Sequence, residues 1–172
     1  DPLPQPGETS AATGYAVGLG GKGANQAVAA ARLGAAVTFV ARIGTDLFGA
    51  EALNQYAEDG ITTQYIVRDC KAPSGIAMIM VDEKGENAIS VASGANMHLT
   101  PADVDCAAPV ITTADVVLLQ LEVPYETVQH TAAKAGRAGV PVILDPAPAR
   151  KLGTELLQHV DYLTPNEVEA EL

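Results

Sequence analysis

The chain has 172 residues, of which 48% are hydrophobic, and its formal net charge is −11. This composition fits one folded domain and excludes a disordered chain, while the negative charge argues against a nucleic-acid-binding surface, because phosphate contacts need clustered Lys and Arg. No apolar run reaches about 18 residues, so we expect no transmembrane helix. The first residues do not resemble a signal peptide, and a cytoplasmic protein is expected.

The first part of the chain predicts alternating strands and helices. A short strand is expected at 13–17, and the glycine cluster that follows it leads into an Ala-rich helix at 24–33. The continuous apolar run 37–43 is typical of a strand covered on both faces. Asp46 is expected to cap the next helix, which ends near Gly60.

The middle of the chain predicts strands without helices between them. These strands are expected at 64–67, 75–81 and 87–92, and the last two flank the charged, glycine-bearing turn 82–86. We therefore expect an antiparallel β lid beside the main sheet, formed by residues 64–92 together with the strand at 13–17.

After residue 96 the alternation of helices and strands resumes. A helix is expected to begin at Pro101, with Thr100 as its N-cap. The later strands are expected at 115–121, 140–144 and 162–164, and the later helices at 125–137, 153–159 and 165–172. Strands alternating with helices form right-handed βαβ units, so the fold class is α/β, with a mostly parallel sheet flanked by helices.

Polar residues that follow predicted strands are the candidates for a functional site. In an open α/β sheet, ligands bind outside the carboxyl ends of the strands. The candidates are Asp46, Glu122, Asp145, Asn166 and Glu169. Each also has a purely structural interpretation: Asp46, for example, can serve simply as a helix cap, and Asp145 can simply end its strand. Their common position at one rim makes the set more informative than any single member.

The glycine cluster before the first helix permits a nucleotide-binding interpretation. Gly18, Gly20 and Gly23 have the spacing of a dinucleotide-binding loop, and Asp46 follows at the distance of a ribose ligand. This hypothesis predicts an NAD-dependent oxidoreductase, but no clear buried strand precedes the loop. A phosphate-binding loop of the Walker type is excluded, because Lys22 is followed by glycine rather than Ser or Thr.

The same cluster also favours a polyhydroxylated ligand. Gly20 and Gly21 allow close backbone approach, and the start of the helix presents free N–H groups. Lys22 adds donors and positive charge, while Asn25 adds a donor and an acceptor one turn further on. The structural alternative is a tight turn whose glycines serve packing alone, which accounts for neither Lys22 nor Asn25.

Several short motifs together carry a family resemblance. They are Leu3-Pro4-Gln5-Pro6-Gly7-Glu8-Thr9, Gly20-Gly21-Lys22-Gly23-Ala24-Asn25-Gln26-Ala27, Arg42-Ile43-Gly44-x-Asp46-x-x-Gly49, Ser93-Gly94-Ala95-Asn96, Gln120-Leu121-Glu122, Asp145-Pro146-Ala147-Pro148-Ala149 and Thr164-Pro165-Asn166-Glu167-x-Glu169. With this order and spacing, the chain resembles the ribokinase (PfkB) family of sugar kinases. The resemblance implies ATP-dependent phosphorylation of the 5-hydroxyl of D-ribose. Another PfkB-type sugar or nucleoside kinase is the nearest alternative.

The resemblance also implies roles for individual residues and cofactors. By family position, the sugar hydroxyls would be bound by Gly20, Gly21, Lys22, Asn25 and Glu122. Asn166 and Glu169 match the family's Asn-x-x-Glu motif, which organises Mg²⁺ and the nucleotide phosphates, so Glu169 is the expected metal residue. The implied cofactors are ATP, Mg²⁺ and a monovalent cation such as K⁺. The implied partner is a second copy of the chain, bound through the lid.

The match to the family pattern is incomplete. The family's Gly-Ala-Gly-Asp segment, whose Asp is the general base, has no counterpart in residues 1–172, nor does its first strand with the Asn-x-Asp sugar ligands. We therefore expect residues 1–172 to be a partial ribokinase-like α/β domain with the lid inserted in it and with no catalytic base of its own. Alone, this chain is expected to show negligible kinase turnover. A non-catalytic sugar-binding or interaction fragment is a second alternative.

The cysteines and histidines show no metal-binding pattern. Cys70 and Cys106 lack Cys-x-x-Cys spacing and are expected to be reduced, partly buried thiols. His98, His130 and His159 are not paired at helical spacing, so no zinc site is expected.

Overall fold

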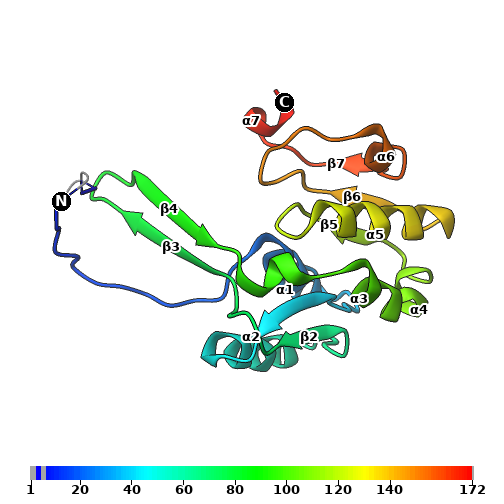
Figure 1. Ribbon diagram of the computed structural model, residues 1–172, viewed down its shortest axis with the longest axis horizontal. Coiled ribbons are helices and arrows are strands. Elements are labelled where there is room, and N and C mark those ends of the chain that lie inside the picture. The colour runs from blue at the N-terminus through cyan, green and yellow to red at the C-terminus, as the bar shows by residue number, and fades with distance from the viewer. Residues whose placement is uncertain (1–2, 5–6, 172) are drawn as a thin grey trace.

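The computed structural model describes residues 3–4 and 7–171 (Figure 1). Its helices are α1 (Lys22–Arg32), α2 (Leu47–Glu58), the 3₁₀ helix η1 (Gly94–His98), α3 (Pro101–Cys106), α4 (Ala108–Ile111), α5 (Tyr125–Arg137), α6 (Thr154–Leu157) and α7 (Glu167–Ala170). Its strands are β1 (Ala41–Gly44), β2 (Ile66–Asp69), β3 (Ile76–Val81), β4 (Asn87–Ala92), β5 (Val117–Leu119), β6 (Val142–Leu144) and β7 (Tyr162–Leu163). The sequence did not predict η1 or α4, and the other helices were expected close to these bounds.

Parallel strands form the body of the molecule. β1 pairs with β2 in one sheet, and β5, β6 and β7 pair in that order in another. Each parallel neighbour follows a helix in the sequence: α2 joins β1 to β2, α5 joins β5 to β6, and α6 joins β6 to β7. This is the βαβ arrangement that the alternating pattern predicts, and it confirms an α/β fold with a mostly parallel sheet.

The larger hydrophobic core lies between β6 and α5. Val142 and Leu144 of β6 are fully buried, as is Leu156 of α6. The buried residues of α5 form one stripe along the helix, as expected for an amphipathic helix against a sheet; they are Thr127, Val128, Thr131, Ala132 and Ala135. This packing fixes the carboxyl ends of β5 and β6.

A second, smaller core holds α1 against α2. Ala24 and Ala27 of α1 pack in a cluster with Ala52 and Tyr56 of α2. Phe39 packs against the same cluster, and its ring meets that of Tyr56 edge-on at a centroid distance of 5.4 Å. The alanines of α1 leave room for these larger side chains, so the position of the helix N-terminus is set by this contact.

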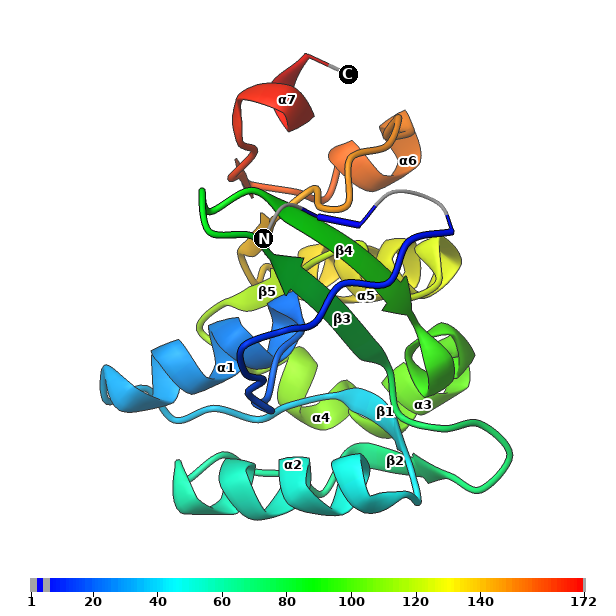
Figure 2. The same cartoon turned by 90° about the vertical axis from the view of Figure 1, so that its left-hand side faces the viewer.

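Strands β3 and β4 form an antiparallel hairpin that projects from the body (Figure 1) and crosses in front of it in Figure 2. Their register pairs Ile76 with Ala92 and Val81 with Asn87. At the turn, the Asp82 carboxylate accepts hydrogen bonds from the backbone N–H groups of Lys84 and Glu86. The hairpin and its charged turn agree with the sequence prediction.

Two strands that were expected in the lid are not part of it: one belongs to the body and the other does not form. β2 (Ile66–Asp69) overlaps the second half of the predicted strand 64–67, and it pairs in parallel with β1 and belongs to the body. Its crossover through α2 brings it back beside β1, where its backbone groups are paired. Residues 13–17 form no strand and pair with no strand that the structure describes. They are exposed, and Tyr15 is 94% exposed. Among the described residues, the lid therefore consists of β3 and β4 alone.

A buried carboxylate joins the first parallel sheet to the segment after the hairpin. Asp69 accepts hydrogen bonds from the Lys71 and Ala72 backbone N–H groups and from the Arg42 guanidinium, and it lies 2.9 Å from Nδ1 of His98. These partners, of which the Lys71 N–H has the largest effect, lower the pKa of Asp69 well below its usual range. The carboxylate thus remains ionised and holds η1 beside β2.

The two cysteines lie at the surface of the molecule. Cys70 and Cys106 are free, but both are exposed rather than partly buried. No three His, Cys, Asp or Glu side chains in residues 3–4 and 7–171 gather in a way that could hold a metal ion. Within the same residues, no helix has both the length and the apolar character needed to cross a membrane.

Candidate functional site

The N-terminus of α1 forms the centre of the candidate site. Gly21 precedes the first helical residue with φ +93°, a conformation that strongly favours glycine. As a glycine, Gly21 provides no side-chain cap for the helix, so the first N–H groups need other partners. The Lys22 N–H donates to Oε2 of Glu122 at 2.8 Å, across a separation of 100 residues. The glycine turn is therefore held from outside by a carboxylate.

Glu122 reaches the helix because of its position after β5. It lies three residues beyond Leu119, the last residue of that strand, at the rim where the strands of this sheet end. Next to it, Gln120 donates a side-chain hydrogen bond to Gln26 of α1. Both glutamines belong to the motifs of the family resemblance, but the sequence alone predicts no separate role for either of them. Their contact fixes α1 against the end of β5.

Asp145 approaches the same helix from the neighbouring strand. It directly follows β6, and its Oδ2 lies 3.8 Å from the ammonium nitrogen of Lys22. The Lys22 and Asp145 side chains are 40% and 19% exposed, so both remain within reach of solvent or a ligand. The structure thus brings together Lys22, Glu122 and Asp145, while Asn25 lies exposed on the first turn of α1.

Asp46 has a different role from the one that the NAD hypothesis requires. Its carboxylate accepts hydrogen bonds from the N–H of Gly49, as the cap of α2, and from the hydroxyl and N–H of Ser74. These bonds, led by that from the Ser74 hydroxyl, lower the pKa of Asp46. Because its oxygens already accept three donors from the protein, the structure does not support Asp46 as a ribose ligand in a dinucleotide site.

Asn166 and Glu169 form a local pair at the start of α7. The Asn166 side chain accepts from the Glu169 N–H at 2.9 Å, and Glu169 Oε2 accepts from the Asn166 N–H at the same distance. This reciprocal arrangement is a capping box. β7 pairs in parallel with β6 and ends just before Asn166. The Asn166–Glu169 pair therefore lies at the same rim of the sheet as Asp145, which follows β6.

The chemistry of this pair fits a magnesium–phosphate site. Mg²⁺ is usually held by one or two carboxylates, with water and phosphate oxygens completing its shell. Glu169 uses one carboxylate oxygen, Oε2, in the capping box, and the second oxygen is available to a ligand. Asn166 is exposed and Glu169 is half-buried, so a phosphate could approach both.

One cavity lies away from these candidates. It is lined by Pro141, His159 and Asp161, among others. Pro141 and Asp161 precede β6 and β7, so this cavity lies at the amino ends of the strands, opposite the rim that carries the candidates. It contains none of the sequence-predicted site residues.

Comparisons with known proteins point to one family. The sequence model described as "pfkB family carbohydrate kinase" matches residues 2–172. A ribokinase of Haemophilus influenzae is 46% identical over 168 residues, covering 98% of this chain and 55% of that protein. A deoxyribokinase of Salmonella typhi is 39% identical over 171 residues, covering 99% and 56%.

A solved structure shows the same arrangement. The structure of Arabidopsis thaliana ribokinase complexed with ribose and ATP matches with a TM-score of 0.89 and 36% identity, covering 97% of this chain and 55% of that one. The chain spans about half the length of the curated relatives that it matches.

Proposed function

The chain belongs to the pfkB family of carbohydrate kinases, and we propose on this premise that it supplies the sugar-binding half of a kinase that transfers the γ-phosphate of ATP to the 5-hydroxyl of D-ribose. The observation that carries the proposal is the contact between Glu122 and the Lys22 N–H. It places a carboxylate, a helix N-terminus and the Gly20–Gly21 backbone at one point. Such a point offers both acceptors and donors, which a sugar needs.

Each sugar-binding residue has a chemical role in this proposal. Gly20 and Gly21 let the backbone lie close to the sugar ring, because they carry no side chain. Glu122 has acceptor capacity beyond its bond to Lys22, so it accepts a sugar O–H. Asn25, exposed one turn into α1, can donate to one hydroxyl and accept from another.

Lys22, which is expected to bind a sugar hydroxyl, is also suited to contact the negatively charged phosphate that is transferred. Its ammonium group faces Asp145 at 3.8 Å and remains partly exposed. An incoming phosphate oxygen would compete with Asp145 for this cation. Phosphoryl transfer depends mainly on positioning and on neutralising the charge of the transferring group, and Lys22 can contribute to both. We assign no catalytic base to this chain.

The nucleotide side of the site is proposed to begin at Asn166 and Glu169. ATP is the expected phosphate donor, since a structural neighbour is described as a complex with ribose and ATP. Mg²⁺ would be held by Glu169, with Asn166 beside it, and would neutralise phosphate charge when bound. A monovalent cation such as K⁺ stays an expectation to which we assign no residue.

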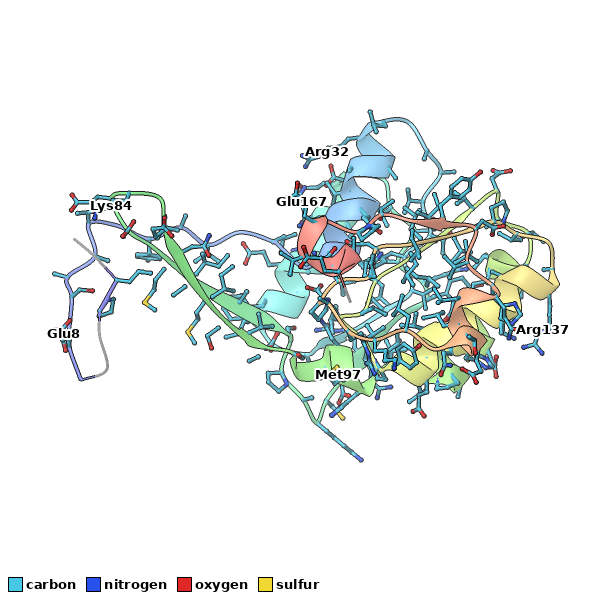
Figure 3. The ribbon with its side chains drawn as sticks, turned by 90° about the horizontal axis from the view of Figure 1, so that it is seen from above. Glu8, Arg32, Lys84, Met97, Arg137 and Glu167 are labelled. Carbon is cyan, nitrogen blue, oxygen red and sulfur yellow. The ribbon has the colours of Figure 1, made fainter. Side chains whose placement is uncertain are left out.

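The hairpin is proposed both to cover the sugar and to bind a second copy of the chain. Ile79, Val81, Ile89 and Val91 alternate onto one face of β3–β4, whereas the other face carries Met78, among other residues. All five are more than half exposed, and Figure 3 shows side chains standing off both faces of the hairpin, out to Lys84 near its tip. Two apolar faces are suited to two occupants, the bound sugar and a partner hairpin.

The two free cysteines agree with the cytoplasm as the expected location.

The closest alternative is a kinase for another sugar. The deoxyribokinase relative favours 2-deoxy-D-ribose as the competing substrate. The two sugars differ by one hydroxyl, and a site that hydrogen-bonds this hydroxyl rejects the analogue that lacks it. A sugar panel therefore distinguishes the two functions.

Calorimetric titration of the chain with D-ribose, 2-deoxy-D-ribose and D-fructose tests the proposal. We expect D-ribose to bind most tightly and Glu122→Gln to weaken its binding. Glu126→Gln, on the exposed first turn of α5, is the control and should bind ribose normally. Tighter binding of 2-deoxy-D-ribose would favour the alternative, and ribose binding that is equal in both variants would refute the assigned site.

A further inference from the structure

The hairpin's orientation depends on its two roots. Every residue of β3 is exposed, as is nearly all of β4, so the hairpin gains little from packing against the body. Figure 1 shows it leaving the body as an arm. Its roots are the segments 73–75 before β3 and 93–96 after β4. Whatever holds these segments decides where the hairpin points.

The two roots touch each other through their backbones. The Ala95 N–H donates to the Pro73 carbonyl at 2.8 Å, and Ala95 is fully buried. Gly94 has φ +51°, and a Cβ on it would lie 2.4 Å from the Pro73 carbonyl oxygen. No side chain fits at that distance, so the backbones of the two roots lie in direct contact. An anchor on the first root therefore also holds the second.

That anchor is Asp46. Its Oδ2 accepts the Ser74 N–H at 2.7 Å, and its Oδ1 accepts the Ser74 hydroxyl at 2.7 Å. The Ser74 oxygen in turn accepts the N–H of Gly44, the last residue of β1, at 3.0 Å. Ser74 is only 9% exposed. The first root is thereby bound to the junction between β1 and α2 in the body.

Capping α2 does not by itself require an aspartate. The cap needs one acceptor for the Gly49 N–H, and Asp46 Oδ1 provides it at 2.9 Å. A serine or threonine at this position could do the same. The carboxylate's second oxygen serves only Ser74, and hydrogen bonds to a charged acceptor are about twice as strong as neutral ones. An aspartate at position 46 therefore satisfies the donors of the hairpin root as well as the N–H group at the start of α2.

We propose that Asp46 is a positioning residue that clamps the hairpin root at Ser74 and thereby sets how the hairpin lies relative to the sugar loop at residues 20–25. The inference rests on the proposed function in one respect: the hairpin is taken as the cover of that sugar site. The clamp itself can be tested without sugar.

Hydrogen exchange of the unliganded chain tests the clamp directly. Asp46→Ser keeps an acceptor for the cap and removes the second oxygen. We expect exchange across 74–94 to rise at least about tenfold, while α5 exchanges as in the unmodified chain. Ser74→Ala should raise it less, because the Ser74 N–H bond to Asp46 remains. Asp59→Asn, at the other end of α2, removes a carboxylate of the same charge and should leave 74–94 unchanged.

Ribose titration then tests the consequence. Asp46→Ser should weaken apparent ribose binding by about threefold to tenfold, and Asp59→Asn should not. Equal exchange across 74–94 in Asp46→Ser, or a rise that is uniform over the chain, would overturn the clamp and leave Asp46 as a helix cap. If Asp46→Ser does not fold, unchanged exchange across 74–94 in Ser74→Ala would overturn it instead. If the unmodified chain does not bind ribose, the proposed function fails, but the exchange result still decides the clamp.

Discussion

The sugar loop and the Asn166–Glu169 pair are held in different ways. The loop at the start of α1 is fixed by contacts from distant parts of the chain: Glu122 on the Lys22 N–H and Asp145 near its ammonium group. The Asn166–Glu169 pair is fixed by hydrogen bonds within four residues. The loop is therefore a product of the tertiary structure, whereas the pair is a local feature. The sugar side should respond strongly to substitutions of distant residues, and the nucleotide side should not.

The largest expected effect separates binding from turnover. If the sugar side is assembled within residues 1–172 and the nucleotide side only begins there, the chain should bind D-ribose and yet turn over at least about a thousandfold more slowly than a typical kinase. Calorimetry and a coupled ATPase assay with ribose measure the two properties on one sample. Robust ribose-dependent ATP consumption would show that the nucleotide side is complete as well.

A substitution on the exposed side of the sugar loop has the next largest effect. Asn25→Ala should weaken D-ribose binding by about 1–3 kcal/mol, because sugar hydroxyls would be left without a partner in the complex. The free energy of unfolding should hardly change, since Asn25 is exposed. Calorimetric titration measures the affinity, with Asn54→Ala on the exposed side of α2 as the control. Equal ribose affinity in the Asn25 variant would remove it from the site.

Charges on the hairpin test whether the face that carries Ile79 and Ile89 binds a second copy. Ile79 and Ile89 are paired across β3 and β4, and they are 59% and 56% exposed. Ile79→Asp with Ile89→Asp should raise the dimer dissociation constant at least about tenfold, because an interface that buries two isoleucines would lose them. Sedimentation equilibrium measures this constant. A chain that is monomeric before substitution would contradict the proposed dimer.

The smallest expected effect concerns Glu169. Glu169→Gln should leave stability within about 0.5 kcal/mol, because glutamine can also complete a capping box. Ribose affinity should likewise remain. In a longer protein that also contains the second half found in the relatives, the same substitution should raise the Mg²⁺ concentration needed for turnover several-fold. Glu167→Gln on the same short helix is the control. An unchanged Mg²⁺ requirement would reduce Glu169 to a helix cap.

Local features could be predicted from the sequence. Asp46 and Thr100 as N-caps, the hairpin turn at Asp82 and the bounds of α5 all follow from short patterns. In each case the forces that decide the structure act between residues a few positions apart, such as a side chain and the N–H groups of the next turn. For the same reason, the resemblance carried by short motifs identified the family.

The partners of the strands could not be predicted in this way. An apolar run indicates a strand but not its environment: β3 and β6 are both apolar runs, yet the structure leaves β3 exposed and buries β6, and it pairs β2 with β1 rather than with the hairpin. The strand expected at 13–17 did not form: these residues are exposed and have no strand partner within the part of the chain that the structure describes. Pairing and burial depend on what lies across the sheet, which the local pattern does not contain.

The sequence by itself determined the family, the N-caps of α2 and α3, the bounds of α5, the hairpin and the residue types of the candidate site, because these depend on local hydrogen bonds and on motif order. Only the tertiary structure decided that Glu122 holds the start of α1, that Asp145 faces Lys22 and that Asp46 serves the hairpin root. These contacts join residues 28 to 123 positions apart in the sequence. They form only when the parallel strands and their helices pack and bring together loops that are distant in the sequence.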